Sequence, residues 1–257
     1  MTLAAFTRMR FAPQIVGFGS LLLAILAFEI LIRVGLLNRF IVPMPSQIAG
    51  AFERVIFEEQ IAERFYLTMK ECVSAAALLA VFGVAIGTLL YKVNILRRAT
   101  ETWVAAAAAA PTVLMYPLFL VIFGRSALTI IMMGFVAGLP AVILKTIEGL
   151  SGTKRVLLNV GRSFKLTPWQ MFWKIQFPSA LPTIFTGFKL GLIFALINVV
   201  GVEFLINFGG LGQLINDLAE RYDLAGTYAA ICFVILVSVC FFIVVERIEQ
   251  WLTPRTD

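Results

Sequence analysis

The chain has 257 residues, of which 60% are hydrophobic and 14% charged, and its mean hydropathy is +0.94. Soluble domains carry about 25% charged residues, so this composition excludes an ordinary soluble domain. Histidine, the commonest metal ligand and general base, is absent, which argues against an intramembrane metalloenzyme. The net charge of +6 fits basic residues held on one side of a membrane, and we expect no nucleic-acid binding.

Apolar runs recur along the whole chain, and six of them have the roughly 20 residues that a helix needs to cross a bilayer. We expect spans at about 15–37, 66–91, 103–123, 127–147, 183–206 and 227–245. The first run is too long for a signal-peptide core and lacks an A-x-A cleavage site, so we expect it to be retained. The sequence therefore predicts an all-α membrane protein with about six transmembrane helices.

Two connections between these runs are long. After the first span, Pro43 and Pro45 preclude a continuous helix, and Ser46 is a candidate N-cap. We expect an amphipathic helix over 47–64 that lies on the outer membrane surface before the second span. We expect the stretch 207–226 to be a polar link between the last two spans.

Basic residues are distributed unevenly between the two sides that six spans would create. With the N-terminus inside, the cytoplasmic set is Arg8, Arg10, Lys92, Arg97, Arg98, Lys145, Lys154, Arg155, Arg162, Lys165, Lys174, Arg247 and Arg255. The outer set is Arg39, Arg54, Arg64, Arg125 and Arg221. This bias follows the positive-inside rule and predicts that both termini are cytoplasmic.

Charged residues inside spans are rare and often functional. Glu29 and Arg33 are four residues apart, which favours a local ion pair on one helix face. Lys189 lies close to the inner end of the fifth span, where we expect its amine to snorkel to the membrane surface. Glu203 lies near the outer end of that span and has either a gating role or a hydrogen-bonded packing role.

The sequence shows no catalytic constellation. It has no P-loop for a nucleotide, and the stretch 150–154 resembles an ATPase signature loop only by coincidence. It has neither a Ser/His pair nor paired carboxylates at helical spacing that face a plausible cleft, and the three cysteines lack metal-ligand spacing. We therefore expect no enzyme activity, no metal and no cofactor bound by this chain itself.

The longest polar interval between spans, 154–182, has helical periodicity on both sides of a turn. Thr167 is a good N-cap in this turn, and Pro168 suits the first helical position. Two short helices that meet on the cytoplasmic side could form a docking element or an amphipathic connection on the bilayer surface. The residues alone leave both interpretations open.

This interval resembles the cytoplasmic loop of the permease subunits of bacterial ABC importers. That loop reads E-A-A, three residues, G, nine residues, then I-x-L-P. The corresponding positions here are Asn159, Val160 and Gly161, then Lys165, and finally Ile175-Gln176-Phe177-Pro178. The spacing and the ending match, whereas the first half of the motif departs from the family's pattern.

Further stretches resemble permeases of the nitrate/sulfonate/taurine (NitT/TauT) type in the same order. The stretch 42–46 resembles the Pro-Ser-Pro turn after their first helix, and 110–119 resembles I-P-x-x-A-x-x-P-L-F. Glu203 with 209–215 resembles A-E…G-L-G-x-L-I. Over about 43–251 the chain is therefore similar to a type I ABC importer permease of this group.

The resemblance implies the type I importer permease fold with a cytoplasmic coupling helix. By this resemblance, the first segment of the chain, 1–61, would contain an N-terminal cytoplasmic tail, the first transmembrane helix and the periplasmic amphipathic helix. The permease core would follow over 62–251, with the coupling loop at 154–178 and a cytoplasmic tail at 252–257. The expected location is a bacterial inner (cytoplasmic) membrane.

The resemblance also implies partners and site residues. Expected partners are ABC ATPase subunits that bind ATP-Mg, a second permease copy, identical or different, and a periplasmic or lipid-anchored substrate-binding protein. The expected ATPase-coupling residues are Asn159, Val160, Gly161, Phe164, Lys165, Leu166, Thr167 and Trp169. The expected translocation-pathway residues are Tyr116, Pro117 and Glu203.

The expected cargo is a small anion or organic solute such as nitrate, a sulfonate or taurine, or a vitamin precursor. The alternative is a stand-alone secondary transporter or channel. Such a protein would show inverted repeats and ionisable residues near mid-membrane in discontinuous helices. The sequence has no clear internal repeat, and its charges inside spans lie towards the span ends.

Overall fold

The computed structural model describes residues 12–38 and 41–252, and every regular element within them is a helix. Four basic residues used for the predicted orientation, Arg8, Arg10, Arg39 and Arg255, lie outside the described residues. Five helices are long and apolar enough to cross a membrane, and one bent helix pair is a sixth candidate. The expected all-α membrane architecture with about six spans is confirmed.

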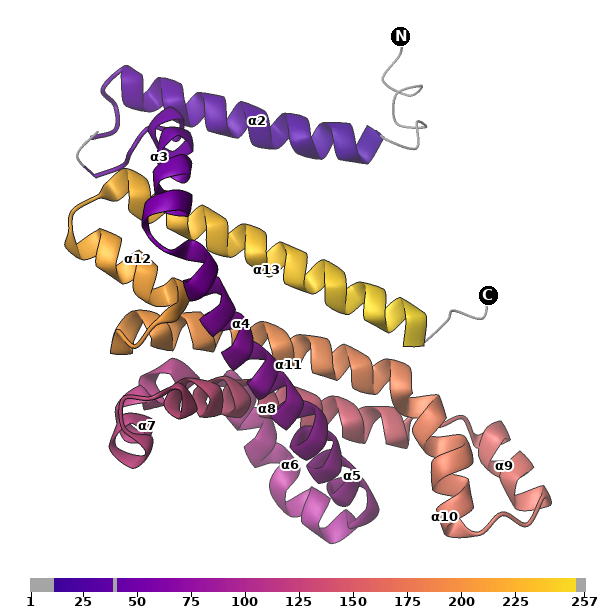
Figure 1. Cartoon of the computed structure of the whole chain (residues 1–257). Helices are drawn as coiled ribbons and strands as arrows, with labels where there is room; N and C mark the ends of the chain where they lie inside the picture. Colours follow the sequence, from indigo (N-terminus) through magenta and orange to yellow (C-terminus); the bar gives the residue numbers. More distant parts are fainter. Residues whose placement is uncertain (1–11, 39–40, 253–257) are drawn as a thin grey trace.

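Most helices run along one direction between two ends of the molecule. In chain order they are α2 (Ala12–Arg33), α3 (Pro45–Glu58), α4 (Ile61–Leu78), α5 (Val84–Lys92), α6 (Asn94–Ala109), α7 (Tyr116–Phe123), α8 (Ala127–Ser151), α9 (Arg155–Ser163), α10 (Pro168–Met171), α11 (Phe177–Ile206), α12 (Gly210–Glu220) and α13 (Leu224–Leu252). Figure 1 shows α9 and α10 at one end, here the α9 end, and α3, α7 and α12 at the opposite end, here the α12 end.

The contact between α8 and α11 forms the centre of the bundle. A Cβ atom added at Gly138 of α8 would meet the backbone of Gly191 on α11 and lie 2.8 Å from Leu79 Cδ1. A Cβ atom at Gly191 would lie 2.7 Å from Val142 Cγ2. Close packing of small residues drives helix association in a bilayer, where lipid removes the hydrophobic driving force. The two glycines therefore set how near these helices approach.

The connection between the first two spans differs from the expectation. Pro45 is the first residue of α3 and Met44 its N-cap, whose N–H donates to Gln47 Oε1 at 3.1 Å, so the predicted N-cap Ser46 is wrong. The helix expected over 47–64 ends at Glu58, because Gln60 adopts a left-handed φ of 52° and turns the chain into α4. The second span then runs over Ile61–Lys92 through a π-helical turn.

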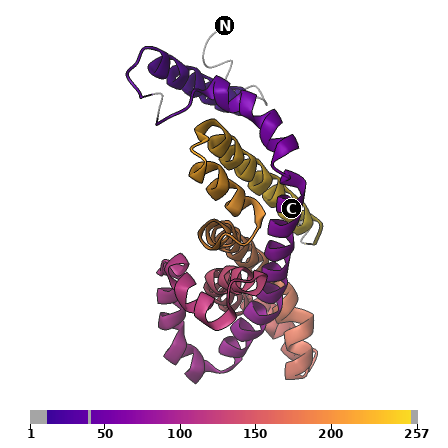
Figure 2. The same cartoon turned by 60° about the vertical axis from the view of Figure 1, so that its left-hand side comes forward.

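The first helix, α2, packs mainly on α3 and stands apart from the bundle (Figure 2). Only 6% of its membrane window is buried, so almost all of its apolar surface faces away from the rest of the described chain. The predicted ion pair is confirmed, with Arg33 Nη2 2.8 Å from Glu29 Oε1. The Ser46 hydroxyl also donates to Glu29 Oε1 at 2.9 Å, which ties α2 to the start of α3.

The predicted third span is not one straight helix. α6 ends at Ala109, a 3-10 turn covers Thr112–Met115, and α7 follows at a bend of 94°. Pro111 causes the break because it has no N–H to donate and restricts the residue before it. The pair is the candidate for the sixth span, and α7 reaches the α12 end of the molecule (Figure 1).

The polar link expected over 207–226 contains a helix, α12. Leu211, Leu214 and Leu218 are spaced three and four residues apart, share one face and are buried against α3 and α13. The polar residues between them lie on the opposite face and lower the mean hydropathy of the stretch, so the buried face could not be recognised from hydropathy alone. The expectation of a simple link was therefore wrong.

We predict that Gly138→Ala strongly destabilises the protein. The added methyl group would overlap backbone atoms of α11 that cannot move independently, and such overpacking costs about 1–3 kcal/mol. The thermal midpoint of the detergent-solubilised protein measures this loss. Gly19→Ala on α2 is the matched control, since an added Cβ there meets nothing within 4 Å. Equal midpoints for the two variants would contradict the close α8–α11 contact.

Candidate functional site

The turn after α9 has the hydrogen bonds of a Schellman motif. The Leu166 N–H donates to the Gly161 carbonyl at 3.1 Å, and the Lys165 N–H donates to the Arg162 carbonyl at 2.9 Å. Lys165 adopts a φ of 53°, the left-handed conformation that glycine takes most easily. Lys165 is also the position at which the resembled importer motif has its glycine. The backbone thus keeps the family's turn although the side chain differs.

The helix that follows this turn begins as the sequence predicted. The Gln170 N–H donates to Thr167 Oγ1 at 3.3 Å, and the Thr167 N–H donates to Gln170 Oε1 at 3.0 Å, which together form a capping box. Pro168 occupies the first helical position, where its missing N–H costs nothing. Both expectations for the turn are confirmed.

The second of the two expected short helices is in fact the start of a span. α10, a π-helical turn over Phe172–Gln176 and α11 form one helix of 39 residues, Pro168–Ile206. Pro178 lies in the first turn of α11, and Pro182 is accommodated inside it. We expected the fifth span to begin only at about residue 183, whereas the helix in the structure already runs through both prolines. The turn at Lys165 is therefore joined rigidly to a helix that spans the molecule.

α9 is held on one face and free on another. Gly161 is buried, and a Cβ atom there would lie 2.6 Å from Ile175 Cδ1, so this position packs on the start of the long helix. Val156, Val160 and Phe164 recur every four residues along an exposed face, and Phe164 is 77% exposed. We call these three residues the α9 stripe. An exposed apolar patch beside polar residues is typical of a protein-binding surface.

The eight predicted coupling residues all lie in this one segment of the chain. Asn159 is exposed and accepts a hydrogen bond from Arg162 Nη1 at 3.3 Å. Leu166 is half-buried, whereas Trp169 is exposed and stacks edge-on against Trp173 with ring centroids 5.5 Å apart. The structure thus brings the predicted set together on one small lobe at the α9 end.

Two contacts that hold this lobe of α9 and α10 against α5 were not found from the sequence. The Lys92 amine lies 4.3 Å from the ring centroid of Phe172, and Gln176 Nε2 donates to the Tyr91 hydroxyl at 3.0 Å. Both contacts join the end of α5 to the start of the long helix. A cation over an aromatic ring contributes about 0.5–2 kcal/mol. In the sequence, Lys92 indicated only the orientation of the spans. Its contact with Phe172 could not be predicted, because the two residues are far apart in the chain.

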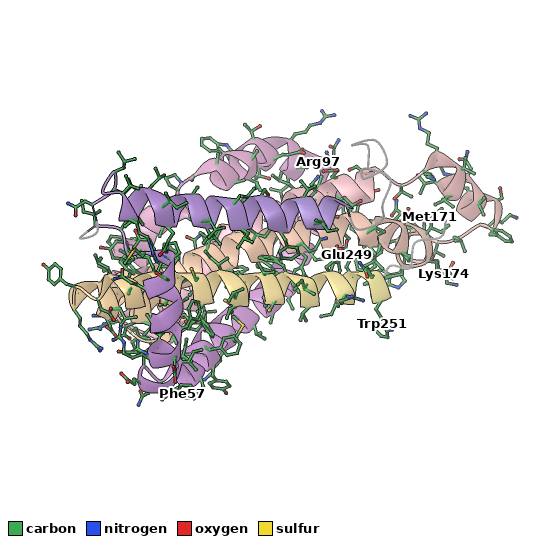
Figure 3. All side chains as sticks on the ribbon, turned by 90° about the horizontal axis from the view of Figure 1, so that it is seen from above. Phe57, Arg97, Met171, Lys174, Glu249 and Trp251 are labelled. Atoms are coloured by element: carbon green, nitrogen blue, oxygen red, sulfur yellow. The ribbon has the colours of Figure 1, made fainter. Side chains whose placement is uncertain are left out.

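Lys189 has a specific partner. Its amine lies 2.6 Å from Glu249 Oε2, and both side chains are half-buried. This ion pair joins α11 to α13, and Figure 3 shows Glu249 towards the end that carries Met171 and Lys174, opposite Phe57. The expected snorkelling of the amine stays a prediction, and the structure adds a carboxylate partner near the same helix end.

The two predicted pathway residues of the third span lie just after its break. Tyr116 is half-buried against an apolar cluster that includes Phe119, whereas Pro117 is exposed. Beside the break, the Thr112 hydroxyl donates to Asn198 Oδ1 of α11 at 3.0 Å. Non-helical backbone at membrane depth is tolerated only inside protein or along a water-filled cavity. The role of Tyr116 and Pro117 in a pathway stays a prediction.

Glu203 lies in the interior of the single chain, with no exposed surface. Its carboxylate accepts hydrogen bonds from the Thr68 hydroxyl at 2.7 Å and the Gly212 N–H at 2.8 Å. Thr68 Oγ1 in turn accepts from the Leu211 N–H at 2.9 Å. The structure thus shows the hydrogen-bonded packing role, and a gating role stays a prediction. Glu71 of α4 lies beside this carboxylate and was not found from the sequence.

Ion pairs close the α12 end. Arg64 Nη2 lies 2.8 Å from Asp217 Oδ2 and joins α4 to α12. Arg54 of α3 pairs with Asp223, whose carboxylate raises the pKa of the guanidinium. Both acids lie in the stretch expected to be a link, so they join α12 to the start of the second span and the beginning of α13 to α3.

Comparison with protein families identifies the chain. The family described as "Binding-protein-dependent transport system inner membrane component" matches residues 80–256, well over half of the sequence. The chain belongs to this family. Its members are inner-membrane subunits of ABC importers, so the resemblance found in the sequence is confirmed.

Individual relatives carry different substrates. The chain is 25% identical over 178 residues to the formylaminopyrimidine transport permease protein ThiX of Halalkalibacterium halodurans, which covers 69% of this chain and 71% of the relative. It is 25% identical over 175 residues to the nitrate import permease protein NrtB of Synechocystis, which covers 68% and 64%. The second relative agrees with the nitrate/sulfonate/taurine type.

A solved structure shows the same fold. A chain of the MetNI methionine ABC transporter in an inward-facing conformation superposes with a TM-score of 0.65 at 20% identity. The match covers 75% of this chain and 96% of that chain. The type I importer permease fold expected from the resemblance is confirmed.

We predict that the turn at Lys165 tolerates glycine and not a β-branched residue. Lys165→Gly relieves the left-handed conformation, which costs an L-residue about 1–2 kcal/mol, and should keep the thermal midpoint and the uptake of the wild type. Lys165→Val should lower uptake severalfold, because a β-branched residue at positive φ is strongly strained. Transport into proteoliposomes measures the difference. Lys174→Val, an exposed lysine at normal φ on the same lobe, is the control, and an equal effect there would contradict the prediction.

Proposed function

We propose that this permease forms the translocation pathway of an ATP-driven importer together with a second permease copy, and that separate ATPase subunits dock on the lobe of α9 and α10. The observation that carries the proposal is the α9 stripe, an exposed apolar surface on a helix that lies at the end of the bundle (Figure 1). A helix that buries Gly161 and exposes Phe164 needs a protein partner to cover it. A groove on an ATPase subunit fits this need.

The long helix supports a mechanism of coupling. The lobe is continuous with α11, which carries Glu203 near its opposite end, so a shift of the docked lobe moves the helix as one body. ATP-Mg would be bound by the ATPase subunits and not by this chain. The coupling needs only contacts with the lobe that differ between the two states of the ATPase pair.

The distribution of charge supports an orientation with the α9 end in the cytoplasm. Lys92 at the end of α5 contacts the lobe, and Arg97 at the start of α6 donates to Ser151 Oγ at the end of α8 at 3.0 Å. These residues belong to the basic set predicted to be cytoplasmic, and the contacts place them near the same end as Lys174. With six spans, both termini would be cytoplasmic.

The proposed cargo is a small anion or polar organic solute, as for the relatives that carry nitrate or formylaminopyrimidine. Two grooves in the described chain, of about 460 and 470 Å³, are lined almost entirely by apolar side chains such as Phe65, Phe241 and Phe204. Binding sites for polar ligands place a few polar groups to orient them. This supports a pathway between two permease copies, with substrate delivered at the α12 end by a binding protein.

We predict that Phe164→Asp abolishes co-purification of the ATPase and ATP-driven uptake while the protein still inserts and keeps its thermal midpoint. The charge would be buried in the docking interface but is fully tolerated on the free chain, where Phe164 is exposed. Pull-down in mild detergent and transport into proteoliposomes measure the two losses.

Phe57→Asp provides the matched control for this experiment. Phe57 is 80% exposed, as fully as Phe164, but lies at the α12 end (Figure 3), so this variant should retain the ATPase. Retention of the ATPase by Phe164→Asp would contradict the docking surface. Transport by the purified permease without any ATPase would instead favour the alternative, a stand-alone secondary transporter.

A further inference from the structure

A second buried carboxyl group lies against Glu203 and has no place in the proposed transport mechanism. Glu71 of α4 is 5% exposed and Glu203 of α11 is 0% exposed, and their carboxyl groups lie beside each other, close enough to share a hydrogen bond. Glu71 Oε2 has no further partner. Ionised carboxylates only accept hydrogen bonds and repel each other when buried, so this contact requires a proton on one of the two groups.

The hydrogen bonds around Glu203 decide which group carries that proton. The Gly212 N–H can only donate, so Glu203 Oε2 must accept. The Thr68 oxygen already accepts from the Leu211 N–H, and its proton points to Glu203 Oε1 at 2.7 Å, since its other acceptor, the Arg64 carbonyl, is farther away at 3.2 Å. Both oxygens of Glu203 thus accept a hydrogen bond, which favours the ionised form of this group and leaves the shared proton to Glu71.

No cation neutralises this pair. The ion pairs found over residues 12–38 and 41–252 leave out both carboxyl groups, and the nearby Arg64 guanidinium is paired with Asp217. Lys70 is the charged neighbour of Glu71 on α4, and its side chain is exposed. A buried charge without a cation needs hydrogen-bond donors instead. Thr68, Gly212 and a protonated Glu71 would supply three.

We infer that Glu71 is protonated and donates a hydrogen bond to the Glu203 carboxylate, which positions that carboxylate to hold the first turn of α12. The first N–H groups of a helix lack partners within the helix and favour a negative charge. Gly210 leaves the space that the carboxylate fills, since a Cβ atom there would overlap the carboxyl group of Glu203. A Cβ atom at Gly212 would lie 2.7 Å from Glu203 Cβ, so both glycines let the start of α12 approach this side chain. Glu71 is a positioning residue that acts through Glu203.

The arrangement connects three helices at one point. Glu71 belongs to α4, Glu203 to α11, and the Gly212 N–H to α12, which itself packs on α13. The proton on Glu71 therefore helps to hold the first turn of α12 against the bundle, beside the Arg64–Asp217 ion pair and the buried leucines. This inference goes beyond the proposed function and depends on neither ATPase docking nor the identity of the cargo.

Infrared spectroscopy tests the protonation directly. The purified protein at neutral pH in an ester-free detergent should show the carbonyl stretch of a protonated carboxyl group above the amide I band, because exposed carboxyls are ionised there. Glu71→Gln should remove this band. Absence of the band in the wild type, or its persistence in Glu71→Gln, would overturn the inference.

Isosteric variants test the direction of the hydrogen bond. In Glu71→Gln the amide donates to Glu203 as the protonated acid does, so the thermal midpoint should stay near that of the wild type. Glu203→Gln places an amide donor against the Gly212 N–H or the Thr68 hydroxyl, and should lower the midpoint by roughly 5 °C. Glu71→Ala, which removes the donor, should also lower the midpoint.

Glu63→Gln is the matched control, an exposed glutamate on the same helix whose replacement should change neither the infrared band nor the midpoint. A larger loss in Glu71→Gln than in Glu203→Gln would overturn the assignment of the proton. Should Glu203→Gln fail to fold, the infrared comparison of the wild type with Glu71→Gln still decides the question. A failure of the ATPase pull-down would leave these outcomes unaffected.

Discussion

The bilayer allows no unpaired backbone N–H or C=O group, and the architecture of this permease follows from that constraint. Regular helices satisfy it internally, so the informative places are the points where a helix starts or breaks. At the break before α7 the Thr112 hydroxyl reaches Asn198, and at the start of α12 the Glu203 carboxylate takes the Gly212 N–H. Side chains of α11 serve both interruptions, which makes this helix the scaffold on which the irregular parts depend.

The continuous helix Pro168–Ile206, of which α11 is the main part, joins the α9 end to the α12 end. Its first turns carry the capping box of Thr167 and the aromatic contacts of Phe172, and its last turns carry Glu203. Close packing against α8 through Gly138 and Gly191 keeps it in place without polar contacts. A rigid connection of this kind supports the proposal that movement of a docked partner at the α9 end is carried to the α12 end.

Features with a local cause could be predicted from the sequence. Hydropathy located the apolar spans, and short-range chemistry located the Glu29–Arg33 ion pair and the Thr167 cap, because both partners lie within four residues. Matching the family motif placed its glycine at Lys165, where the backbone is left-handed. Helix ends were less accurate: a π-helical turn carried one span through Pro178, and the polar face of α12 hid its buried leucines.

The sequence by itself determined the class, a polytopic helical membrane protein with an importer-type loop, since both follow from composition and from motifs read along the chain. Only the tertiary structure decided which distant side chains meet. It paired Lys189 with Glu249, placed Lys92 over Phe172, and set Glu71 beside Glu203. The physical reason is that hydropathy and capping act between near neighbours, whereas the partner of a buried charge depends on how helices far apart in the chain pack together.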